Sequence, residues 1–461
     1  MYRTGIQRER TAAAAEIFSL VCVAGAVAAV PFADRLTSVL LVLSTFLFAV
    51  ICQYSRRYLD GDPEQARFYL WLCCTGACVF GLILAQNLLW FALAWLATSL
   101  SLHQLLQFYP DRPGAVLAAR KKFLISRLGD CALAGALVLT YRVFGTWDFG
   151  KLFAAADRLH QIPASVGAIA CLLVFAAMLK SAQFPFHSWL PDTMEAPTPV
   201  SALMHAGIIN AGGILVIRLS PLISLSPPAM TALTVVGSFT ALFGSVVALT
   251  QASVKRCLAF STVAQMGFMM LECGLGAFHL ALLHLVAHSL YKAYAFLASG
   301  SVVSNPPVRR GRAVGWAALA AGLLAASAGW LASFTLFDEP VLSGIFFLGL
   351  AQLLWASRGV WYAFAGVLAG VGLAAVYFGL EAVASIIVAP AAHHPNNKAL
   401  SGAILLAFLT TALAQSQLPS IWRNRTVSTF YIHARNGFYF NALANRLTMA
   451  LWPVRQNERS L

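Results

Sequence analysis

The sequence predicts an all-α polytopic membrane protein, and three observations point to this fold class. Hydrophobic residues make up 59% of the 461 positions, charged residues only 10%, and the mean hydropathy is +0.75. Soluble globular proteins carry about 25% charged residues, so most of this chain is expected to avoid water. The apolar runs are continuous, whereas the strands of a transmembrane β-barrel would alternate apolar and polar residues.

Apolar runs interrupted by glycine, proline or charge predict about fourteen transmembrane helices. One spanning helix needs roughly 20 apolar residues, and the hydrophobic content is sufficient for roughly that many. The expected helices cover residues 12–33, 36–53, 68–86, 87–107, 123–144, 164–184, 197–217, 229–250, 256–274, 278–300, 313–333, 341–356, 359–388 and 399–415.

The charged loops between these helices predict their orientation. Basic residues collect in cytoplasmic loops, and the strongest basic clusters all fall on one side of the expected arrangement. Both termini are therefore expected in the cytoplasm, and the net charge of +14 needs no nucleic-acid partner. The clusters at 120–122 and 309–312 are expected to be solvated loops or docking surfaces. The start of the chain shows no convincing cleavage site, so no cleavable signal peptide is expected.

The sequence shows no signature of a bound cofactor. It contains neither a Walker-type phosphate loop nor a dinucleotide fingerprint, and its nine cysteines form no Cys-x-x-Cys pair. The chain is therefore expected to be no enzyme and to hold neither cofactor nor metal. Its energy is expected to come from an ion gradient or from a partner.

Two candidate functional residues flank an expected break in a helix. A charge at the centre of a bilayer costs at least about 2.5 kcal/mol and marks an ion pathway unless it is paired. Lys180 ends an apolar run, and prolines at 185, 191, 197 and 199 follow it before His205. Because proline breaks helices, and a broken helix at membrane depth must line protein or water, both side chains are candidates for an ion path. A lysine that snorkels to the interface and a packing histidine are the alternatives.

A third candidate is a stripe of ionisable residues on one helix. His284, His288 and Lys292 lie at positions i, i+4 and i+8, so they share one face and rise over roughly 12 Å. Bound water between such groups would conduct protons. Asp130, expected near a helix start, is a candidate for either helix capping or charge relay. Lys255 and Glu272, near the ends of expected helices, are further candidates for the relay.

The residues around the break resemble a known family. The run KSAQFPFHSWLPD at 180–192 and the run PTPVSALMHA at 197–206 closely resemble the central signature of antiporter-like membrane subunits. This family includes NuoL of respiratory complex I, the large Mrp cation/proton antiporter subunit, and DabB of an inorganic-carbon transporter. The resemblance covers roughly residues 34–300 and includes the segments 54–59, 127–130, 255–267 and 284–300.

The resemblance implies a pair of inverted helical repeats, each with a broken helix, around a hydrated polar axis. Lys180 would be the central proton-accepting lysine of this axis. The relay would continue through His205, His284, His288 and Lys292.

Departures from the family pattern favour the DabB type. Leu96 replaces the glutamate that normally pairs with the central lysine, and His103 is a possible substitute for it. The lysine-containing motif that the family carries in its second half is not found after residue 300. The 46 residues after 415 are expected to be too few for the long lateral helix of NuoL. The segments 96–109, 118–122 and 431–439 are most similar to DabB.

The function implied by this resemblance is ion conduction that powers uptake of CO2 or bicarbonate. The chain would conduct a cation, H+ or Na+, with the proton as the leading candidate, in the inner membrane of a bacterium. A DabA-like partner on the cytoplasmic side, which resembles a zinc carbonic anhydrase, would hold the zinc. The alternatives are a NuoL-like subunit of a respiratory or hydrogenase complex, an Mrp-type antiporter subunit, and a structural subunit with a vestigial relay.

The expected organisation has four parts. Residues 1–110 form N-terminal helices, and 111–300 form the ion-conducting core with its break around 180–200. Residues 301–415 form shortened C-terminal helices, and 416–461 form a cytoplasmic tail.

Overall fold

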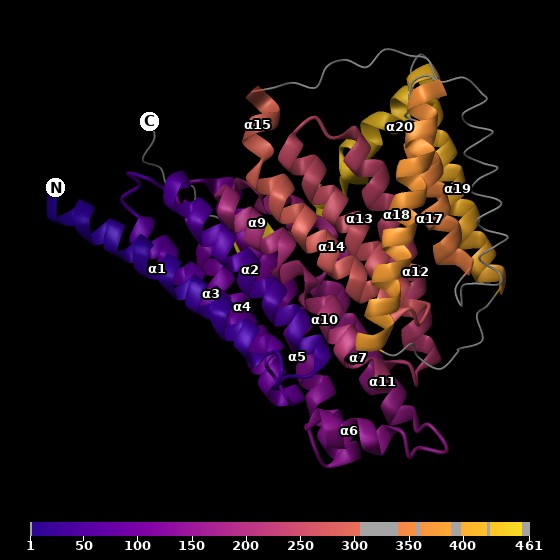
Figure 1. Ribbon diagram of the computed structural model, residues 1–461, viewed down its shortest axis with the longest axis horizontal. Coiled ribbons are helices and arrows are strands. Elements are labelled where there is room, and N and C mark those ends of the chain that lie inside the picture. The colour runs from indigo at the N-terminus through magenta and orange to yellow at the C-terminus, as the bar shows by residue number, and fades with distance from the viewer. Residues whose placement is uncertain (1, 305–339, 356–359, 389–397, 422–424, 454–461) are drawn as a thin grey trace.

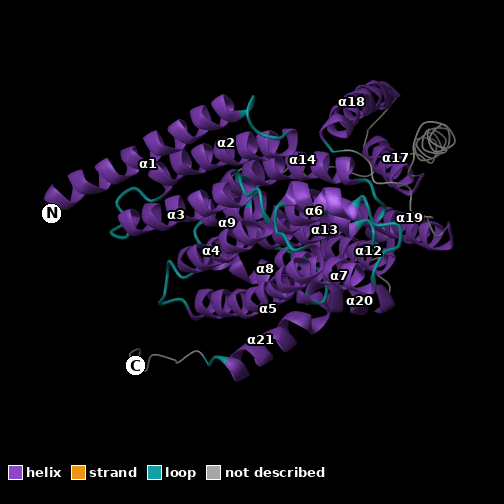
Figure 2. Cartoon of the chain, turned by 90° about the horizontal axis from the view of Figure 1, so that it is seen from below, coloured by secondary structure: helices purple, strands orange, loops and turns teal. Residues whose placement is uncertain are grey.

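The computed structural model describes residues 2–304, 340–355, 360–388, 398–421 and 425–453. These residues are almost entirely helical (Figure 2). Among them, β pairing is limited to an isolated bridge between Asn87 and Asp148. The expected all-α class is confirmed.

The helices of the first half form a bundle that narrows toward the N-terminus (Figure 1). They are α1 (Tyr2–Ala29), α2 (Arg35–Tyr58), α3 (Gln65–Ile83), α4 (Leu88–Leu106), α5 (Pro113–Phe144), the short α6 (Phe149–Ala156) and α7 (Ala164–Lys180). The second half continues with α12 (Pro227–Thr250), α13 (Val254–Gly274), α14 (Phe278–Leu297), α15 (Ser299–Ser304), α17 (Pro340–Trp355), α18 (Val360–Ile387) and α19 (Lys398–Ile421).

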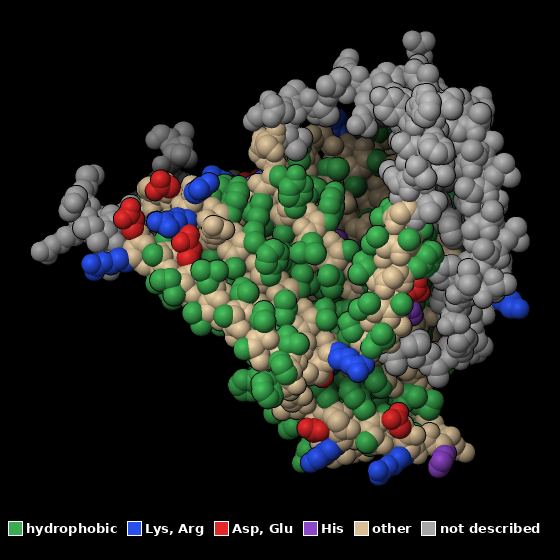
Figure 3. Space-filling view, in the orientation of Figure 1, with side chains coloured by type: hydrophobic (Ala, Val, Ile, Leu, Met, Phe, Trp, Pro, Cys, Tyr) green, Lys and Arg blue, Asp and Glu red, His purple; other side chains and the backbone are tan. Residues whose placement is uncertain are grey.

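Ten helices of the described chain are long and apolar enough to cross a membrane, and two shorter apolar helices, Ala164–Lys180 and Gly372–Ile387, accompany them. Apolar side chains cover the face shown in Figure 3, and charged side chains gather at its two ends, as a bilayer requires. The polytopic membrane fold is confirmed. The expected helix at 313–333 lies outside the described residues, and the total of fourteen and the side of the termini stay predictions.

Side-chain caps and a left-handed glycine set several helix ends. Asp34 accepts a hydrogen bond from the backbone N–H of Thr37 (2.9 Å) at the start of α2, and Asn87 accepts one from Trp90 (2.7 Å) at the start of α4. The pKa of Asp34 lies below its ordinary value. Burial alone would raise this pKa, but the hydrogen bonds from Thr37 and the charge of Arg218 lower it by more. Gly145 ends α5 with a φ of +68°, which glycine adopts without strain.

Several helices differ from the expected bounds: α1 begins at Tyr2 and not at 12, and α19 ends at Ile421 and not at 415. Two further differences have a clear physical reason. The sequence predicts a helix from 123 because the basic cluster before it reads as a loop, but α5 already begins at Pro113, a residue suited to the first turn of a helix. The helix expected over 197–217 is divided at Gly207, where a 3₁₀ turn over Ile208–Asn210 separates α9 (Thr198–Ala206) from α10 (Ala211–Arg218).

The chain between α7 and α9 is the broken segment on which the site depends. After Lys180 it passes through a 3₁₀ turn at Phe186–Ser188, the one-turn α8 (Trp189–Asp192) and a second 3₁₀ turn at Thr193–Glu195. Three of the four prolines, at 185, 191 and 197, lie within it. Since proline donates no backbone hydrogen bond, these residues cannot continue α7.

The second-half helices pack around α12, α13 and α14. Helix α18 contacts α14, while α19 contacts α12 and α17, and these C-terminal helices stand at one side of the bundle in Figure 1. The tail expected after 415 forms two further helices on the core. Helix α20 (Arg425–Arg435) contacts α12, and α21 (Phe440–Leu451) contacts α5.

Glycines allow α12 and α13 to approach closely. A Cβ on Gly267 would overlap the backbone nitrogen of Ala241 and lie 2.8 Å from the carbonyl oxygen of Gly237. Backbone atoms of two packed helices cannot move aside cheaply. Small residues at such contacts are typical of helix pairs in membranes.

Replacing Gly267 by leucine should therefore prevent normal folding. Overpacking a well-packed core costs about 1–3 kcal/mol or more. We expect a lower melting temperature and a smaller monodisperse fraction when the detergent-solubilised protein is analysed by size exclusion. Gly25→Leu in α1 is the matched control, because a Cβ at Gly25 has no neighbour within 4 Å; equal stability of the two variants would contradict the packing argument.

Candidate functional site

Buried polar side chains gather at two places inside the bundle. We name them the Lys180 cluster, on α4, α5 and α7, and the Lys292 cluster, on α9, α13 and α14. The members of the Lys180 cluster are Trp95, Ser99, Lys122, Arg127, Asp130 and Lys180; those of the Lys292 cluster are His205, Ser261, Thr262, His288 and Lys292.

Trp95 joins Lys180 to Asp130. The Lys180 ammonium, 6% exposed at the end of α7, donates a hydrogen bond to the Trp95 carbonyl oxygen (3.4 Å) and lies 4.4 Å from the centre of the Trp95 ring. The indole N–H of Trp95 in turn donates to Asp130 Oδ1 (3.0 Å), and Asp130 Oδ2 pairs with Arg127 at 2.7 Å. One tryptophan therefore places an ammonium and a carboxylate in a single connected network.

The location of Asp130 excludes one of its two expected roles. Because α5 begins at Pro113, Asp130 lies well inside the helix and cannot cap its N-terminus. The capping interpretation is wrong, and the position beside Trp95 leaves the charge-relay role as a prediction. Asp130 thus supplies a carboxylate to the network that contains Lys180.

Two buried lysines of α5 were missed by the sequence interpretation. Lys121 and Lys122 are each 2% exposed, so the expectation of a solvated loop or docking surface at 120–122 is wrong. The Lys122 ammonium donates to the carbonyl oxygen (2.9 Å) and hydroxyl (2.8 Å) of Ser99. His103, one turn beyond Ser99 on α4, packs its ring on Phe123 at 5.1 Å. It therefore lies on the Lys122 side of the cluster.

Two adjacent residues of helix α13, Ser261 and Thr262, contact Lys292 and His205 respectively. The Lys292 ammonium is fully buried and donates to the Ser261 hydroxyl (2.9 Å) and the Leu258 carbonyl oxygen (3.2 Å). The next residue, Thr262, lies 3.1 Å from His205 Nδ1, while the imidazole of His205 stacks on Phe296. The structure thus brings together two candidates that are 87 residues apart in the sequence.

The stripe on α14 continues from Lys292 through His288 to His284. The two imidazole rings lie 6.2 Å apart. At the far end, His284 Nδ1 lies 2.9 Å from Glu272 Oε2, and Glu272 is only 5% exposed. Glu272, expected to be a helix-end group, is therefore the carboxylate partner of this stripe.

Several buried nitrogens and oxygens near the stripe have no hydrogen-bond partner among the described residues. They are Nε2 of His205, both ring nitrogens of His288, Nε2 of His284 and Oδ1 of Asn210. Buried polar atoms in proteins are nearly always hydrogen-bonded, often to internal water. Asn210 already donates to the hydroxyl of Ser289, beside His288 (2.8 Å). These atoms mark where bound water would connect α9 with α14.

Two further polar contacts lie outside this stripe. The Lys255 ammonium donates to the Thr198 hydroxyl (2.9 Å) and so links the starts of α13 and α9. His279 Nε2 lies 3.7 Å from Glu381 Oε1 of α18, a pair that the sequence interpretation did not find. Within the described residues, no group of three or more His, Cys, Asp or Glu side chains could hold a metal ion. Zinc in a partner stays a prediction.

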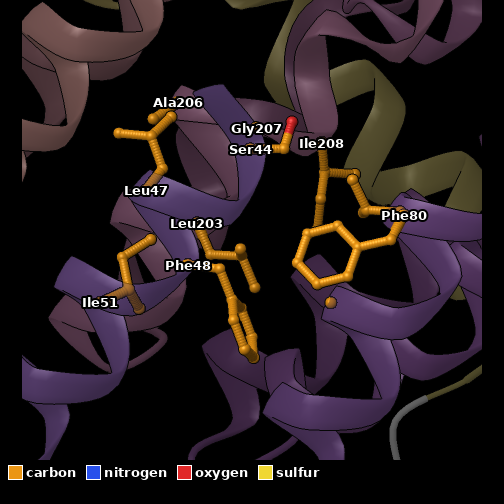
Figure 4. A pocket seen from close by; sticks show the side chains of 11 residues that line it. Ser44, Leu47, Phe48, Ile51, Phe80, Leu203, Ala206, Gly207 and Ile208 are labelled. Atoms are coloured by element: carbon orange, nitrogen blue, oxygen red, sulfur yellow. The ribbon is translucent and has the colours of Figure 1, made fainter. Parts of the chain in front are cut away.

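An apolar pocket lies beside the division between α9 and α10 (Figure 4). Phe48 and Phe80 of α2 and α3 face Leu203 and Ile208 across it. Ser44 is its one polar side chain. An ion needs polar partners, so the site is assigned to the two clusters and not to this pocket.

An ion pair between the buried Lys121 and the partly buried Asp192 connects α5 to the broken segment and to the tail. The Lys121 ammonium lies 2.5 Å from Asp192 Oδ2 and donates to Asn441 Oδ1 (2.6 Å), while the Asn441 amide donates to Asp192 Oδ1 (2.9 Å). The single Asn441 side chain of α21 thus bonds to both members of the pair. The partners lie 71 and 320 residues from Lys121 along the chain, which explains why no local pattern revealed them.

Replacing Asp192 by alanine should destabilise the protein strongly. Removing one partner of a buried ion pair leaves an uncompensated charge and costs about 3–5 kcal/mol, whereas replacing both partners by apolar residues is often neutral. We therefore expect a clear loss of thermal stability in Asp192→Ala and its recovery in the double variant Lys121→Met/Asp192→Leu. Asp111→Ala in the loop before α5 is the control, and a double variant no more stable than the single one would contradict the pairing.

Comparison with known proteins identifies the wider family. The family model for the transmembrane part of NADH:quinone oxidoreductase and Mrp antiporter subunits matches residues 85–369. The "Probable inorganic carbon transporter subunit DabB2" of Halothiobacillus neapolitanus is 40% identical over 92% of this chain and 80% of its own length. The "Probable inorganic carbon transporter subunit DabB" of Hydrogenovibrio crunogenus is 38% identical, over 92% and 83%.

More distant similarities cover less of the other chain. Subunit 5 of the chloroplast NAD(P)H-quinone oxidoreductase of Lemna minor is 39% identical over 59% of this chain and 37% of its own. Among solved structures, the Mrp complex from a Dietzia species matches with a TM-score of 0.56 and 24% identity, over 91% of this chain and 48% of that one. This structural likeness supports the fold.

Proposed function

We propose a function on the basis of the family: the chain belongs to the NADH:quinone oxidoreductase/Mrp antiporter family of membrane subunits, and it is about 40% identical to two DabB members over 92% of its length. It is a multi-pass protein of the cell membrane. Its function, in our proposal, is to conduct a cation, with the proton as the leading candidate, down its gradient and so to power inorganic-carbon uptake by a partner subunit.

The observation that carries this proposal is the burial of ionisable side chains along the inside of the bundle. Lys180 and Lys292 are 6% and 0% exposed, and His205 and His288 are 0% and 5% exposed. Ionisable residues inside membrane spans are costly and mark proton relays and ion pathways. A purely structural subunit would have no need of four such groups beside unpartnered polar atoms.

The relay that we propose has two halves. In the first, Lys180 exchanges a proton within the network that Trp95 and Asp130 form. In the second, His205, His288 and Lys292 pass the proton along α14 through bound water, with Glu272 and His284 at its far end. Histidine suits this task because it gains and loses a proton near neutral pH.

Chemistry on the carbon substrate belongs to the partner in this proposal. The partner would be a DabA-like subunit on the cytoplasmic side that holds zinc and hydrates CO2 to bicarbonate and a proton. The flow of the ion through this chain, down its gradient, would keep that reaction in one direction.

A respiratory role is the second candidate. It is favoured by the similarity to subunit 5 of NAD(P)H-quinone oxidoreductases, but that similarity covers 59% of the chain, whereas the similarity to the DabB proteins covers 92%. The broader match includes the C-terminal region and therefore favours the carbon transporter.

Co-purification tests the partner. The chain carries an affinity tag in its native host, and the solubilised complex is analysed by mass spectrometry and for zinc. We expect a stoichiometric soluble-type subunit with about one zinc per complex; the untagged chain, taken through the same purification, is the control for specific retention. Recovery of dehydrogenase subunits, or of a partner without zinc, would contradict the proposal.

A further inference from the structure

Helix α21 has its polar face turned inward. Asn441 bonds to Lys121 of α5, and Ala444, Asn445 and Thr448, which share its side of the helix, are buried or half-buried. Leu443, Leu447 and Leu451, at positions i, i+4 and i+8, are 56%, 57% and 75% exposed. A helix on the surface of a soluble protein shows the opposite arrangement.

The outward leucines thus form a continuous apolar stripe that the described chain leaves uncovered. We define this leucine stripe by Leu443, Leu447 and Leu451. Figure 2 shows α21 at the edge of the molecule beside α5, with no described helix on its outer side. An exposed apolar stripe of this kind requires an apolar environment or a partner.

The position of α21 along α5 favours the membrane interface. Helix α5 has 32 residues, which at 1.5 Å per residue makes it about 48 Å long, against a hydrocarbon core of about 30 Å. About 18 Å of the helix therefore lies beyond the hydrocarbon, and we place this excess at the N-terminal end because that end carries Arg112 and Arg120. Helix α21 contacts this end: Arg120 donates to the carbonyl oxygens of Trp452 (3.3 Å) and Pro453 (2.5 Å), and the adjacent Lys121 bonds to Asn441.

The charge of the tail is complementary to anionic lipid. Residues 425–453 contain three arginines, Arg425, Arg435 and Arg446, and no aspartate or glutamate. Arg446 is exposed on α21 next to Leu447. Helices with leucine on one face and arginine at its border lie in the interface and bind anionic headgroups.

We propose that α21 is an interfacial helix whose leucine stripe inserts into the bilayer surface, with anionic lipid headgroups at Arg446. Its inward face at the same time holds the broken segment through Asn441. A lipid-anchored helix would thus be bonded to Asp192, twelve residues after Lys180 on the same broken segment. The inference goes beyond the proposed function and does not depend on it, because it concerns the lipid contact of one helix.

Spin-label accessibility tests the proposal on the full chain without any partner. The nine native cysteines are replaced, and a nitroxide is attached at Leu447→Cys in nanodiscs of phosphatidylcholine with phosphatidylglycerol. Phe239→Cys, exposed on the membrane span α12, is the lipid reference, Asp111→Cys the water reference, and Thr448→Cys the buried reference. We expect oxygen to collide with the label at position 447 as at 239, and water-soluble nickel chelate to collide several-fold less than at 111.

Every other pattern overturns the proposal. Nickel accessibility like that of Asp111→Cys would show that the stripe faces water and awaits a protein partner, and low accessibility to both reagents, as at Thr448→Cys, would show that the chain itself covers it. Two further measurements test the headgroup contact. The label at position 447 should become more accessible to nickel in nanodiscs of phosphatidylcholine alone. It should also become more accessible when Arg446→Gln is added to the labelled protein in the anionic nanodiscs. No change in either case would refute the role of Arg446.

Discussion

Replacing Lys180 by methionine should abolish growth at low CO2 while leaving the protein in the membrane. Methionine has a similar volume and no charge, so the variant removes the ammonium that bonds to Trp95 without opening a large cavity. A relay with one member missing cannot conduct. The measurement is complementation of a strain that lacks the chain, in air and in CO2-enriched gas, with the membrane level followed by immunoblotting.

Lys151→Met is the matched control for this variant. Lys151 is an exposed lysine near the start of α6, far from both clusters, and its replacement should leave growth unchanged. Growth of the Lys180→Met strain in air at the wild-type rate would remove Lys180 from the relay. It would favour a subunit whose buried lysine has only a structural role.

Replacing His288 by alanine should have an equally large effect. His288 lies between His284 and Lys292 on α14, and neither of its ring nitrogens has a hydrogen-bond partner among the described residues. Loss of the imidazole would interrupt the stripe at its centre, so we expect growth in air to fall to that of the strain without the chain. The same complementation assay measures it.

The matched control lies on the same helix. His279 lies at the start of α14, pairs with Glu381 of α18 and is outside the relay. Growth in air should therefore be retained in His279→Ala. If both histidine variants lost growth in air, the defect would reflect helix packing and not proton transfer; if both retained it, His288 would have no part in the relay.

The helices were predictable because the membrane imposes a simple pattern. A continuous apolar run must become a helix, since only helices satisfy their own backbone in lipid, and the expected bounds agree with α2, α4, α12 and α13 within a few residues. The break after Lys180 was predictable for a similar reason, because prolines cannot continue a helix. The division at Gly207 was not, because no proline marks it.

The candidate site was predictable only where burial follows from the sequence. Lys180, His205 and the α14 stripe stand out because they interrupt apolar runs. Lys121 and Lys122 do not, because a basic cluster at the end of a loop is usually solvated. Their burial depends on Ser99, Asp192 and Asn441, which distant parts of the chain bring to them. Glu272 was likewise not recognised as the partner of His284, because only the fold brings the two side chains together.

The most direct test of the proposed relay is inorganic-carbon uptake under a controlled ion gradient. Cells that express the chain with its partner are given radiolabelled inorganic carbon, with and without a protonophore, and Lys180→Met cells are measured in parallel. We predict accumulation above equilibrium in the wild type, and its collapse both with the protonophore and in Lys180→Met. Accumulation that persists in Lys180→Met while the protonophore abolishes it would contradict a relay through Lys180.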